Sequence, residues 1–245
     1  MNTQTILFDL DDTLIHCNKY FISVIERFAR LMAEWFKGYP FTAEDFKRKQ
    51  SELDLAGVHV HGFVKDRFPQ SLVETYAYFS ELTGRKKRAE EENFLFRLGL
   101  SVYEQEYEPY PFMSETLDHL KNQGHELCLY TGGDQAVQTF KVRQMNLESY
   151  FEDRIFISPH KTTDVLEGVL KTMDLERSLT WMIGNSARTD IIPALEAGIN
   201  AIHIPASKEW EYNSVEINIE PRGVFKKLPS LKHVPPTIRN HISGK

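Results

Sequence analysis

Four short apolar runs in the second half of the chain constrain its fold most strongly. They are "HELCLYTGG" (125–133), "DRIFISPHK" (153–161), "LTWMIGNS" (179–186) and "INAIHIP" (199–205). One helix-forming segment precedes the first run, at residues 112–124, and three others separate the runs, at residues 134–147, 162–175 and 189–198. Short apolar strands that alternate with helices are typical of an α/β fold, a parallel sheet with helices on both faces. A further apolar run at residues 4–9 joins the same set of predicted strands.

The block between the first strand and residue 110 is different, because it is rich in charged residues, aromatics and helix formers. The stretch "YFISVIERFARLMAEWF" (20–36) spaces its apolar residues at three and four, as one face of a helix does. Thr42 follows Pro40 and is expected to be an N-cap, and Gly84 is expected to end a later helix. We find no strand pattern in this block and expect an inserted all-helical cap domain.

The predicted core domain therefore combines residues 1–15 and 110–225, and the helical cap takes residues 16–109. The basic, proline-punctuated segment 226–245 is predicted to be a tail that packs loosely on the surface. Within the cap, "GVHVHGF" (57–63) suggests a short extended stretch, which would place His59 and His61 on one side.

Composition limits the kinds of partner that we expect. Of the 245 residues, 41% are apolar, which is enough for a packed interior. The net charge of −6, without a basic stripe, argues against a nucleic-acid binder. Two cysteines make no disulfide framework and favour a reducing compartment. Neither a signal peptide nor an apolar stretch of about 18 residues is found, so we expect a cytoplasmic protein without a membrane partner.

Polar side chains gather where the predicted strands end. In "FDLDDTL" (8–14), Asp9, Asp11 and Asp12 directly follow an apolar run. Like charges this close repel, so either a cation belongs among them or they form a solvated loop. Asp12 is expected to be a structural or helix-capping residue. The later strands are followed by "TGGD" (131–134), "HK" (160–161) and "GNSARTD" (184–190). Ligands of open parallel sheets bind beyond the carboxyl ends of strands, which makes these segments the candidate site.

These four segments, in this order, resemble the motifs of the haloacid dehalogenase (HAD) superfamily. The family motifs are DxDx(T/V), a strand-end Thr or Ser, a Lys, and an acidic pair such as GDxxxxD. All four occur here across about 180 residues of the chain. The resemblance implies a Rossmann-like sheet in a HAD-like core, and it identifies the helical insert as the family's C1 type of cap. It also implies a hydrolase of the C1-capped phosphatase type.

The resemblance implies roles for the strand-end residues. Asp9 would attack phosphorus and form an aspartyl-phosphate that water later breaks. Asp11 would protonate the leaving alcohol and then deprotonate the attacking water. Thr131 and the backbone N–H of Gly132 would bind the phosphate, and Lys161 would supply a fixed positive charge to the phosphoryl group and Asp9.

A pocket that holds a phosphate and several carboxylates needs a divalent cation, and oxygen donors favour Mg²⁺. By resemblance, its ligands are the Asp9 carboxylate, the Asp11 backbone carbonyl and a side chain of the fourth motif, Asn185 or Asp190. Asn185 departs from the family pattern, since an acid is usual there, and a neutral ligand lowers the expected metal affinity. Asp190 either ligates through water or holds Lys161. Asn185→Asp is expected to tighten Mg²⁺ binding if Asn185 is a direct ligand.

The expected function is a Mg²⁺-dependent phosphomonoesterase acting on a small phosphorylated metabolite. Three alternatives remain open. A phosphotransferase of the sugar-mutase type shares every motif. A 2-haloacid dehalogenase needs no metal but generally lacks the second acid, here Asp11. A non-enzymatic phosphate-binding protein is favoured only by Asn185. The sequence specifies neither the physiological substrate nor whether the protein is a monomer or a homodimer.

Overall fold

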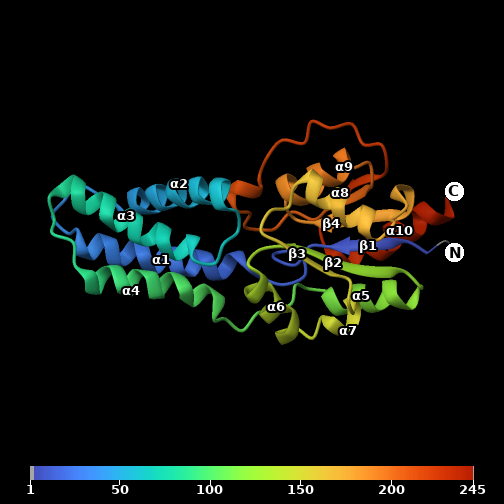
Figure 1. Ribbon diagram of the computed structural model, residues 1–245, viewed down its shortest axis with the longest axis horizontal. Coiled ribbons are helices and arrows are strands. Elements are labelled where there is room, and N and C mark those ends of the chain that lie inside the picture. Colours follow the sequence, from blue (N-terminus) through green and yellow to red (C-terminus); the bar gives the residue numbers. More distant parts are fainter. Residues whose placement is uncertain (1–2, 245) are drawn as a thin grey trace. The chain divides into compact units, whose positions relative to one another are not determined.

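The computed structural model describes residues 3–244, which divide into two compact units. One unit takes the chain up to Asn18 and again from Tyr107 onward, and the other is Lys19–Glu106. The first is built around a β-sheet and the second is helical (Figure 1). The helical unit falls in the region predicted as a cap, residues 16–109, and its role as a cap stays a prediction.

The α/β unit contains a sheet of parallel strands in the order β3-β2-β1-β4-β5-β6. The strands are β1 (Thr5–Phe8), β2 (Glu126–Gly132), β3 (Ile155–Ser158), β4 (Thr180–Gly184), β5 (Asn200–His203) and β6 (Phe225–Lys227). The chain adds strands on one side of β1 and then crosses to the other side, where it adds β4. This confirms the predicted Rossmann-like sheet, and such a reversal of strand order creates the crevice in which ligands of these sheets bind.

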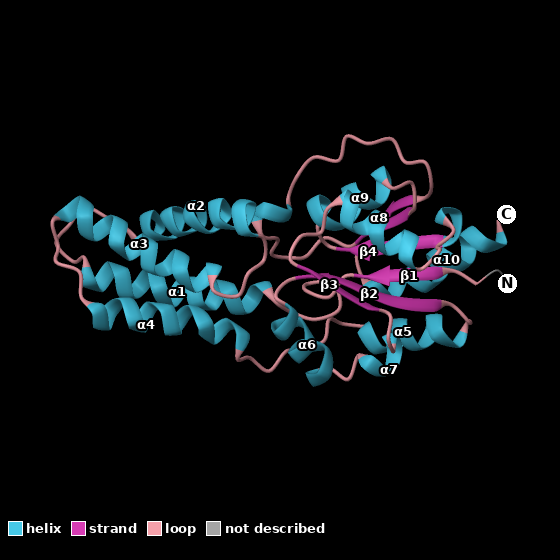
Figure 2. Cartoon of the chain, viewed as in Figure 1, coloured by secondary structure: helices cyan, strands magenta, loops and turns pink. Residues whose placement is uncertain are grey.

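Helices cover both faces of the sheet, which explains why the side chains in the middle of its central strands are mostly apolar. Figure 2 shows α8 and α9 on one side and α5, α6 and α7 on the other. Leu7 belongs to the cluster under α8 and α9, whereas the neighbouring Phe8 packs toward Phe151 of α7, because successive strand residues face opposite sides. The helices of this unit are α5 (Met113–Asn122), α6 (Gln135–Gln144), α7 (Glu148–Phe151), α8 (Thr163–Thr172), α9 (Ile192–Glu196) and α10 (Val234–Ser243).

The C-terminal segment is more ordered than predicted. β6 extends the sheet by pairing with β5, and α10 buries Val234 and Ile238 completely. The expectation of a loosely packed tail over 226–245 was therefore wrong for the residues up to 244. The apolar side chains that anchor α10 are few and are separated by prolines and basic residues, so the sequence shows no long periodic pattern.

The second unit consists of helices and contains no strand within residues 19–106, as predicted. Its helices are α1 (Asn18–Trp35), α2 (Ala43–His61), α3 (Arg67–Thr83) and α4 (Ala89–Leu100). Helix α3 packs against both α2 and α4, and an aromatic-rich core forms between the helices around Phe28, Phe46 and Tyr76. All three of these side chains are fully buried, which agrees with the apolar spacing seen in the sequence.

The helix ends follow the expected capping chemistry. The Thr42 side chain accepts from the Asp45 N–H while the Asp45 side chain accepts from the Thr42 N–H, which is a complete capping box. Gly84 ends α3 with a φ of 69°, a conformation that favours glycine. The extended stretch predicted at 57–63 was wrong, because α2 continues to His61. Buried side chains at Phe46, Gln50 and Asp54 keep one face of this helix packed, which outweighs the weak helix propensity of "GVHV".

Burial of Asp54 within α2 makes the stability of the protein depend on pH. Burial raises the pKa of Asp54 to about 6, although Arg67 opposes the shift. The folded protein then holds this proton more tightly than the unfolded chain, so the destabilisation is absent below about pH 4 and complete above about pH 6. We expect Asp54→Asn to raise the free energy of unfolding by roughly 2–3 kcal/mol at about pH 8 and to change little at about pH 4. Urea unfolding at both pH values, with the exposed Asp66→Asn as control, checks this; an equal effect at both would contradict it.

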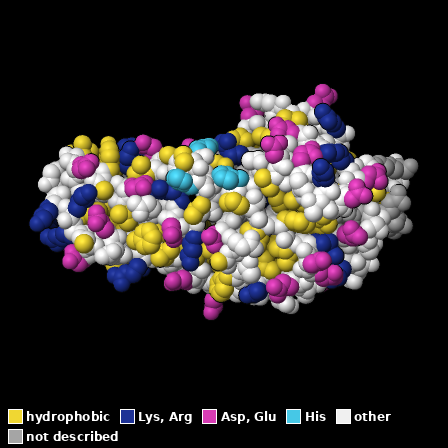
Figure 3. Space-filling model, viewed as in Figure 1, with side chains coloured by type: hydrophobic (Ala, Val, Ile, Leu, Met, Phe, Trp, Pro, Cys, Tyr) yellow, Lys and Arg dark blue, Asp and Glu magenta, His cyan; other side chains and the backbone are white. Residues whose placement is uncertain are grey.

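The surface carries mixed charge. On the face shown in Figure 3, Lys and Arg side chains are interspersed with Asp and Glu rather than gathered into a stripe. Within residues 3–244, no helix has both the length and the apolar character needed to cross a membrane.

Candidate active site

The predicted site residues lie at the carboxyl ends of four neighbouring strands. Asp9 directly follows β1, Thr131 is the penultimate residue of β2, and Asn185 directly follows β4. Lys161 lies in the connection from β3 to α8, just before the N-cap residue Thr162. Because these strands are parallel neighbours, their carboxyl ends share one edge of the sheet, where the strand order reverses.

Asp9, Lys161 and Asp190 form one buried ionic cluster. The Lys161 Nζ atom lies 2.8 Å from Asp9 Oδ1 and also donates to Asp190 Oδ1. The three residues are between 1% and 6% exposed, so water screens these charges poorly. Of the two roles expected for Asp190, the contact with Lys161 is therefore present.

Burial and charge shift the pKa values of this cluster. Burial, together with the nearby Asp190 charge, raises the pKa of Asp9 to about 7, although Lys161 opposes the shift. Burial disfavours the ammonium form of Lys161, but Asp190 and Asp9 outweigh it, so the pKa of Lys161 is raised overall. Lys161 therefore stays charged and supplies a fixed positive charge beside the predicted nucleophile.

The turn after β4 is shaped to hold Asp190. Asp190 Oδ2 accepts from the Ser186 N–H at 2.9 Å. A Cβ atom at Gly184 would lie 2.1 Å from this carboxylate, so only glycine leaves room for it. Thus Gly184 and Ser186 fix the Asp190 side chain in the orientation that reaches Lys161.

Asp11 has a different set of partners from Asp9. Its carboxylate lies 2.7 and 2.8 Å from Lys141 Nζ and accepts from Gln138 Nε2 at 3.0 Å. Both partners come from α6 and are almost fully buried, whereas Asp11 is partly exposed. The predicted proton donor is therefore held by two residues that were not among the predicted site residues.

The loop after β2 places Thr131 as a hydrogen-bond donor. Gln138 Nε2 donates to Thr131 Oγ1 at 2.7 Å, so the Thr131 hydroxyl hydrogen is left to donate, and it makes a long contact of 3.5 Å with the Gly132 carbonyl oxygen. Gly132 ends β2, and Gly133 has a φ of 147°, which a residue with a side chain rarely adopts. Helix α6 begins after Asp134, as expected, but the Asp134 side chain already accepts from the first N–H groups of that helix.

Asn185 is fixed by contacts on both sides of its amide. Its Nδ2 atom donates to Glu209 at 3.0 and 3.1 Å, and its Oδ1 atom accepts from Thr13 Oγ1 at 3.3 Å. The Asn185 N–H also donates to Thr13 Oγ1 at 3.0 Å. Because a carboxylate accepts but does not donate, Glu209 requires the NH₂ group of the amide and turns Oδ1 away from itself.

Asp12 caps a helix, as expected. It accepts from the N–H groups of Cys17 and Asn18, at 3.1 and 2.9 Å, at the start of α1. The Asp12 backbone has a φ of 61°. Burial raises the pKa of Asp12 to about 7, although the hydrogen bonds from these two N–H groups lower it. Asp12 is thus engaged in the local turn rather than in the cluster around Asp9.

The groups expected to hold a metal ion are all oxygen donors, which a hard divalent cation prefers. Asp9 and Asp190 bring two negative charges and Lys161 one positive charge, so the buried cluster keeps an excess negative charge when both acids are ionised. Within the described part of the chain, no three His, Cys, Asp or Glu side chains gather as a metal site. A cation would therefore also need neutral oxygens such as the Asn185 amide and the Asp11 carbonyl. This oxygen-rich set fits Mg²⁺.

The residues that the sequence analysis missed are Gln138, Lys141 and Glu209. None directly follows a strand, so the rule that ligands bind beyond the carboxyl ends of parallel strands does not predict these three residues. The signal for the first two was their spacing, because residues three apart lie on one helix face and α6 begins directly after the predicted phosphate-binding loop. Glu209 lies in the long connection after β5, and nothing in its local sequence links it to Asn185.

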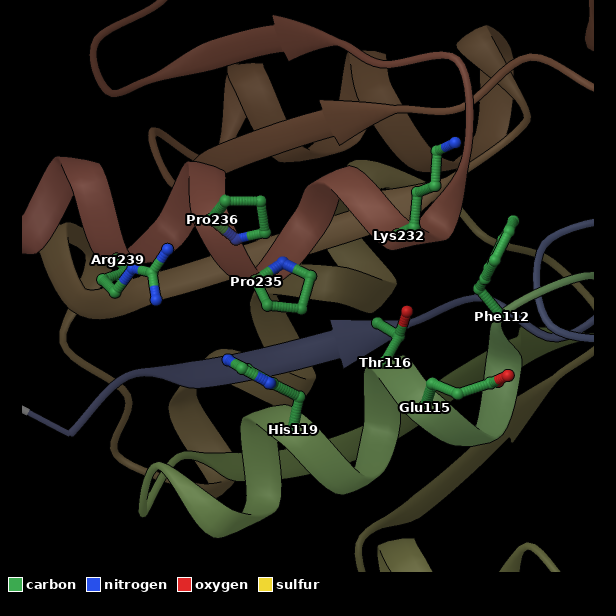
Figure 4. A pocket seen from close by; sticks show the side chains of 8 residues that line it. All are labelled: Phe112, Glu115, Thr116, His119, Lys232, Pro235, Pro236 and Arg239. Carbon is green, nitrogen blue, oxygen red and sulfur yellow. The ribbon is translucent and has the colours of Figure 1, made fainter.

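A separate cavity of about 250 Å³ lies between α5 and α10 (Figure 4). Phe112, Thr116 and His119 line it on one side, and Lys232, Pro235 and Arg239 on the other. None of the predicted catalytic residues lines this cavity, so it is not the candidate active site.

Two curated proteins that resemble this chain over most of its length are phosphatases. A glyceraldehyde 3-phosphate phosphatase from Methanothermobacter thermautotrophicus is 25% identical over 94% of this chain and 99% of its own. A ribulose-1,5-bisphosphate 5-phosphatase from Halopiger xanaduensis is 26% identical over 83% of this chain and 85% of its own.

The fold is also found in solved structures. A haloacid dehalogenase-like family hydrolase from Xanthomonas campestris superposes with a TM-score of 0.80 and 23% identity, covering 97% of this chain and 91% of its own. The sequence profile of the haloacid dehalogenase-like hydrolases matches residues 3–198, which is most of the chain. The ordered motifs, the sheet and this match agree, and the chain belongs to the haloacid dehalogenase-like hydrolase family.

Proposed function

We propose that the protein is a Mg²⁺-dependent phosphatase that hydrolyses a small phosphorylated metabolite through an aspartyl-phosphate on Asp9. The observation that carries the proposal is the buried Asp9–Lys161 pair, 2.8 Å between Oδ1 and Nζ, at the sheet edge that also bears Thr131. A carboxylate beside a permanent positive charge is suited to meet a phosphoryl group, whose oxygens are negative. The phosphatase names of two relatives support the same reaction class.

In the first half of the proposed reaction, the phosphoryl group binds between Thr131 and Lys161. The Thr131 hydroxyl and the Gly132 N–H donate to phosphoryl oxygens, and the Lys161 ammonium offsets their charge. Asp9 attacks phosphorus and displaces the alcohol oxygen, which takes a proton from Asp11. The bond from phosphorus to the leaving oxygen breaks as the bond to Asp9 forms.

In the second half, Asp11 takes a proton from water, and the water oxygen attacks phosphorus to release phosphate and restore Asp9. Lys161 stays charged throughout, so the stabilising field needs no rearrangement during either step. Asp9, Asn185, Asp190 and the Asp11 carbonyl would hold Mg²⁺, which when bound neutralises phosphoryl charge.

The names of the relatives narrow the substrate class that we propose. One acts on glyceraldehyde 3-phosphate and the other on ribulose 1,5-bisphosphate, both of which are small phosphorylated sugars. We therefore propose that phosphorylated sugars of similar size are the first compounds to test as substrates.

Phosphate release from p-nitrophenyl phosphate and a panel of small sugar phosphates, with and without Mg²⁺ after chelation, tests the proposal. We expect turnover that requires the metal. Transfer of the phosphoryl group to a second sugar without phosphate release would indicate a phosphotransferase. Haloacetate turnover without metal would indicate a dehalogenase. Binding of phosphorylated compounds without turnover would indicate a binding protein.

Glu209 changes what we expect from Asn185→Asp. An aspartate at 185 would lose the NH₂ donor and place a second carboxylate about 3 Å from Glu209. The lost hydrogen bond to Glu209, together with the new repulsion between the two carboxylates, should destabilise the fold by roughly 1–3 kcal/mol. It should also cancel any gain in Mg²⁺ affinity.

The double variant Asn185→Asp/Glu209→Gln removes this repulsion and is expected to bind Mg²⁺ more tightly than the wild type. Calorimetric Mg²⁺ titration of both variants and of Glu209→Gln alone measures the difference. Tighter binding by the single Asn185→Asp variant would contradict this account of Glu209.

A further inference from the structure

Helix α6 presents two buried polar side chains to the candidate site, and both contact Asp11. Lys141 is 3% exposed and Gln138 is 1% exposed, although both residue types usually lie at the surface. Lys141 Nζ contacts both oxygens of the Asp11 carboxylate, at 2.7 and 2.8 Å. Burying an ammonium group without a counter-charge is costly. Within the described part of the chain, Lys141 forms an ion pair with the Asp11 carboxylate.

Two other neighbours of Lys141 Nζ carry no carboxylate that could balance its positive charge. Cys17 Sγ lies 3.7 Å from Nζ, and the Tyr107 ring centroid lies 5.1 Å away. The Lys141 ammonium group is therefore directed at the Asp11 carboxylate.

Gln138 joins Asp11 to the phosphate-binding loop. Its Nε2 atom lies 3.0 Å from Asp11 Oδ2, 2.7 Å from Thr131 Oγ1 and 3.0 Å from the Gly132 carbonyl oxygen. A Cβ atom at Gly133 would lie 2.8 Å from Gln138 Cγ, so the glycine makes room for this side chain. One amide group thus fixes the relative positions of the proposed proton donor and a proposed phosphate ligand.

We propose that Lys141 and Gln138 are positioning residues for Asp11. They hold its carboxyl group where it can exchange a proton with the leaving oxygen, and Gln138 also keeps the Thr131 hydroxyl turned as a donor. This inference rests on the proposed function, since it assigns supporting residues to that reaction. Lys161 forms ion pairs with Asp9 and Asp190, whereas Lys141 forms one with Asp11. The site therefore has one ammonium group beside the proposed nucleophile and another beside the proposed proton donor.

The dependence of rate on the leaving group separates positioning of Asp11 from a purely structural role. An alkyl alcohol leaves as a neutral molecule and needs a proton, whereas p-nitrophenolate is a good leaving group without one. Loss of Asp11 placement should therefore lower kcat/KM for an alkyl phosphate more than for p-nitrophenyl phosphate. General damage to the fold lowers both by the same factor.

The test compares kcat/KM for p-nitrophenyl phosphate and for a sugar phosphate that the wild type hydrolyses, in Lys141→Met, Gln138→Leu and Asp11→Asn. We expect the ratio of sugar phosphate to aryl phosphate to fall about tenfold or more in all three. Arg143→Met and Gln135→Leu remove a cation and an amide from exposed positions of α6 and should keep the wild-type ratio. Lys141→Arg should recover part of the loss, and Lys141→Met should add little to Asp11→Asn.

An unchanged ratio in both Lys141→Met and Gln138→Leu, in folded protein, would overturn the inference. If Lys141→Met does not fold, Gln138→Leu decides, because it removes no charge. Failure of the proposed function looks different, since the wild type would then release phosphate from neither compound. An unaltered ratio in Asp11→Asn would show that Asp11 is not the proton donor that these residues position.

Discussion

Replacing Asp9 by asparagine is expected to lower turnover of a phosphorylated sugar by at least about a thousandfold, because an amide cannot attack phosphorus as a carboxylate does. The side chain keeps its shape, and its oxygen can still accept from Lys161, which lies 2.8 Å from Asp9 Oδ1 in the wild type. The loss should therefore fall on kcat, and binding of inorganic phosphate should change much less.

Stability should not fall together with activity in this variant. Burial and Asp190 raise the pKa of Asp9 to about 7, so ionised Asp9 destabilises the folded protein at alkaline pH. Asp9→Asn removes this charge, and we expect a thermal midpoint at about pH 8 that is no lower than that of the wild type. Steady-state rates and thermal unfolding on one preparation measure both. A variant that retains most of its rate would show that Asp9 is not the nucleophile.

Replacing Lys161 by methionine is expected to have the second largest effect, on stability and rate together. Lys161 is the cation that contacts both Asp9 and Asp190, and its loss leaves two buried carboxylates facing one another. Breaking a buried pair in this way costs about 3–5 kcal/mol of folding free energy. Removal of the fixed charge beside the phosphoryl group should also lower kcat by about a hundredfold to a thousandfold.

A double variant separates these two effects of Lys161. Lys161→Met/Asp190→Asn removes one of the two opposing carboxylates, so we expect it to regain stability but not rate. Lys171→Met, on the exposed side of α8, is the matched control and should change neither. Urea unfolding and steady-state kinetics distinguish the outcomes. Recovery of the rate in the double variant would mean that Lys161 acts only by keeping the fold intact.

The sequence predicted the central sheet because its strands are buried on both faces and read as short apolar runs. The sequence did not predict β6, because this edge strand has only three residues and contains Lys226 and Lys227, so it has no apolar pattern. The helical conformation at the end of α2 differs from the predicted extended stretch for a related reason. The "GVHV" stretch has weak helix propensity, and the packing that keeps it helical is tertiary and cannot be read from neighbouring residues.

Within the candidate site, Asp9, Thr131, Lys161 and Asn185 could be selected from the sequence, because each lies at or just beyond the carboxyl end of a strand. The same criterion could not locate residues that enter the site from a helix face. In the sequence, Lys141 looks like an ordinary lysine of a surface helix. Only its burial against Asp11 gives it a role.

The environment of Asn185 was also beyond the sequence. The substitution of an amide for the usual acid suggested only a weaker metal site. The structure adds that Glu209 supplies a carboxylate next to the amide, 24 positions further along the chain. An asparagine at position 185 is therefore compatible with Glu209, since an amide can donate a hydrogen bond to the Glu209 carboxylate and an ionised acid cannot.

Acid quenching of the enzyme during turnover of a phosphorylated sugar, followed by mass spectrometry of the peptide that contains Asp9, tests the central claim most directly. Acyl phosphates survive brief exposure to acid and react with hydroxylamine, which provides a second check on the linkage. The account predicts one phosphoryl group on Asp9, lost on hydroxylamine treatment and absent from Asp9→Asn. A phosphoryl group on another residue of an enzyme that turns over would contradict it.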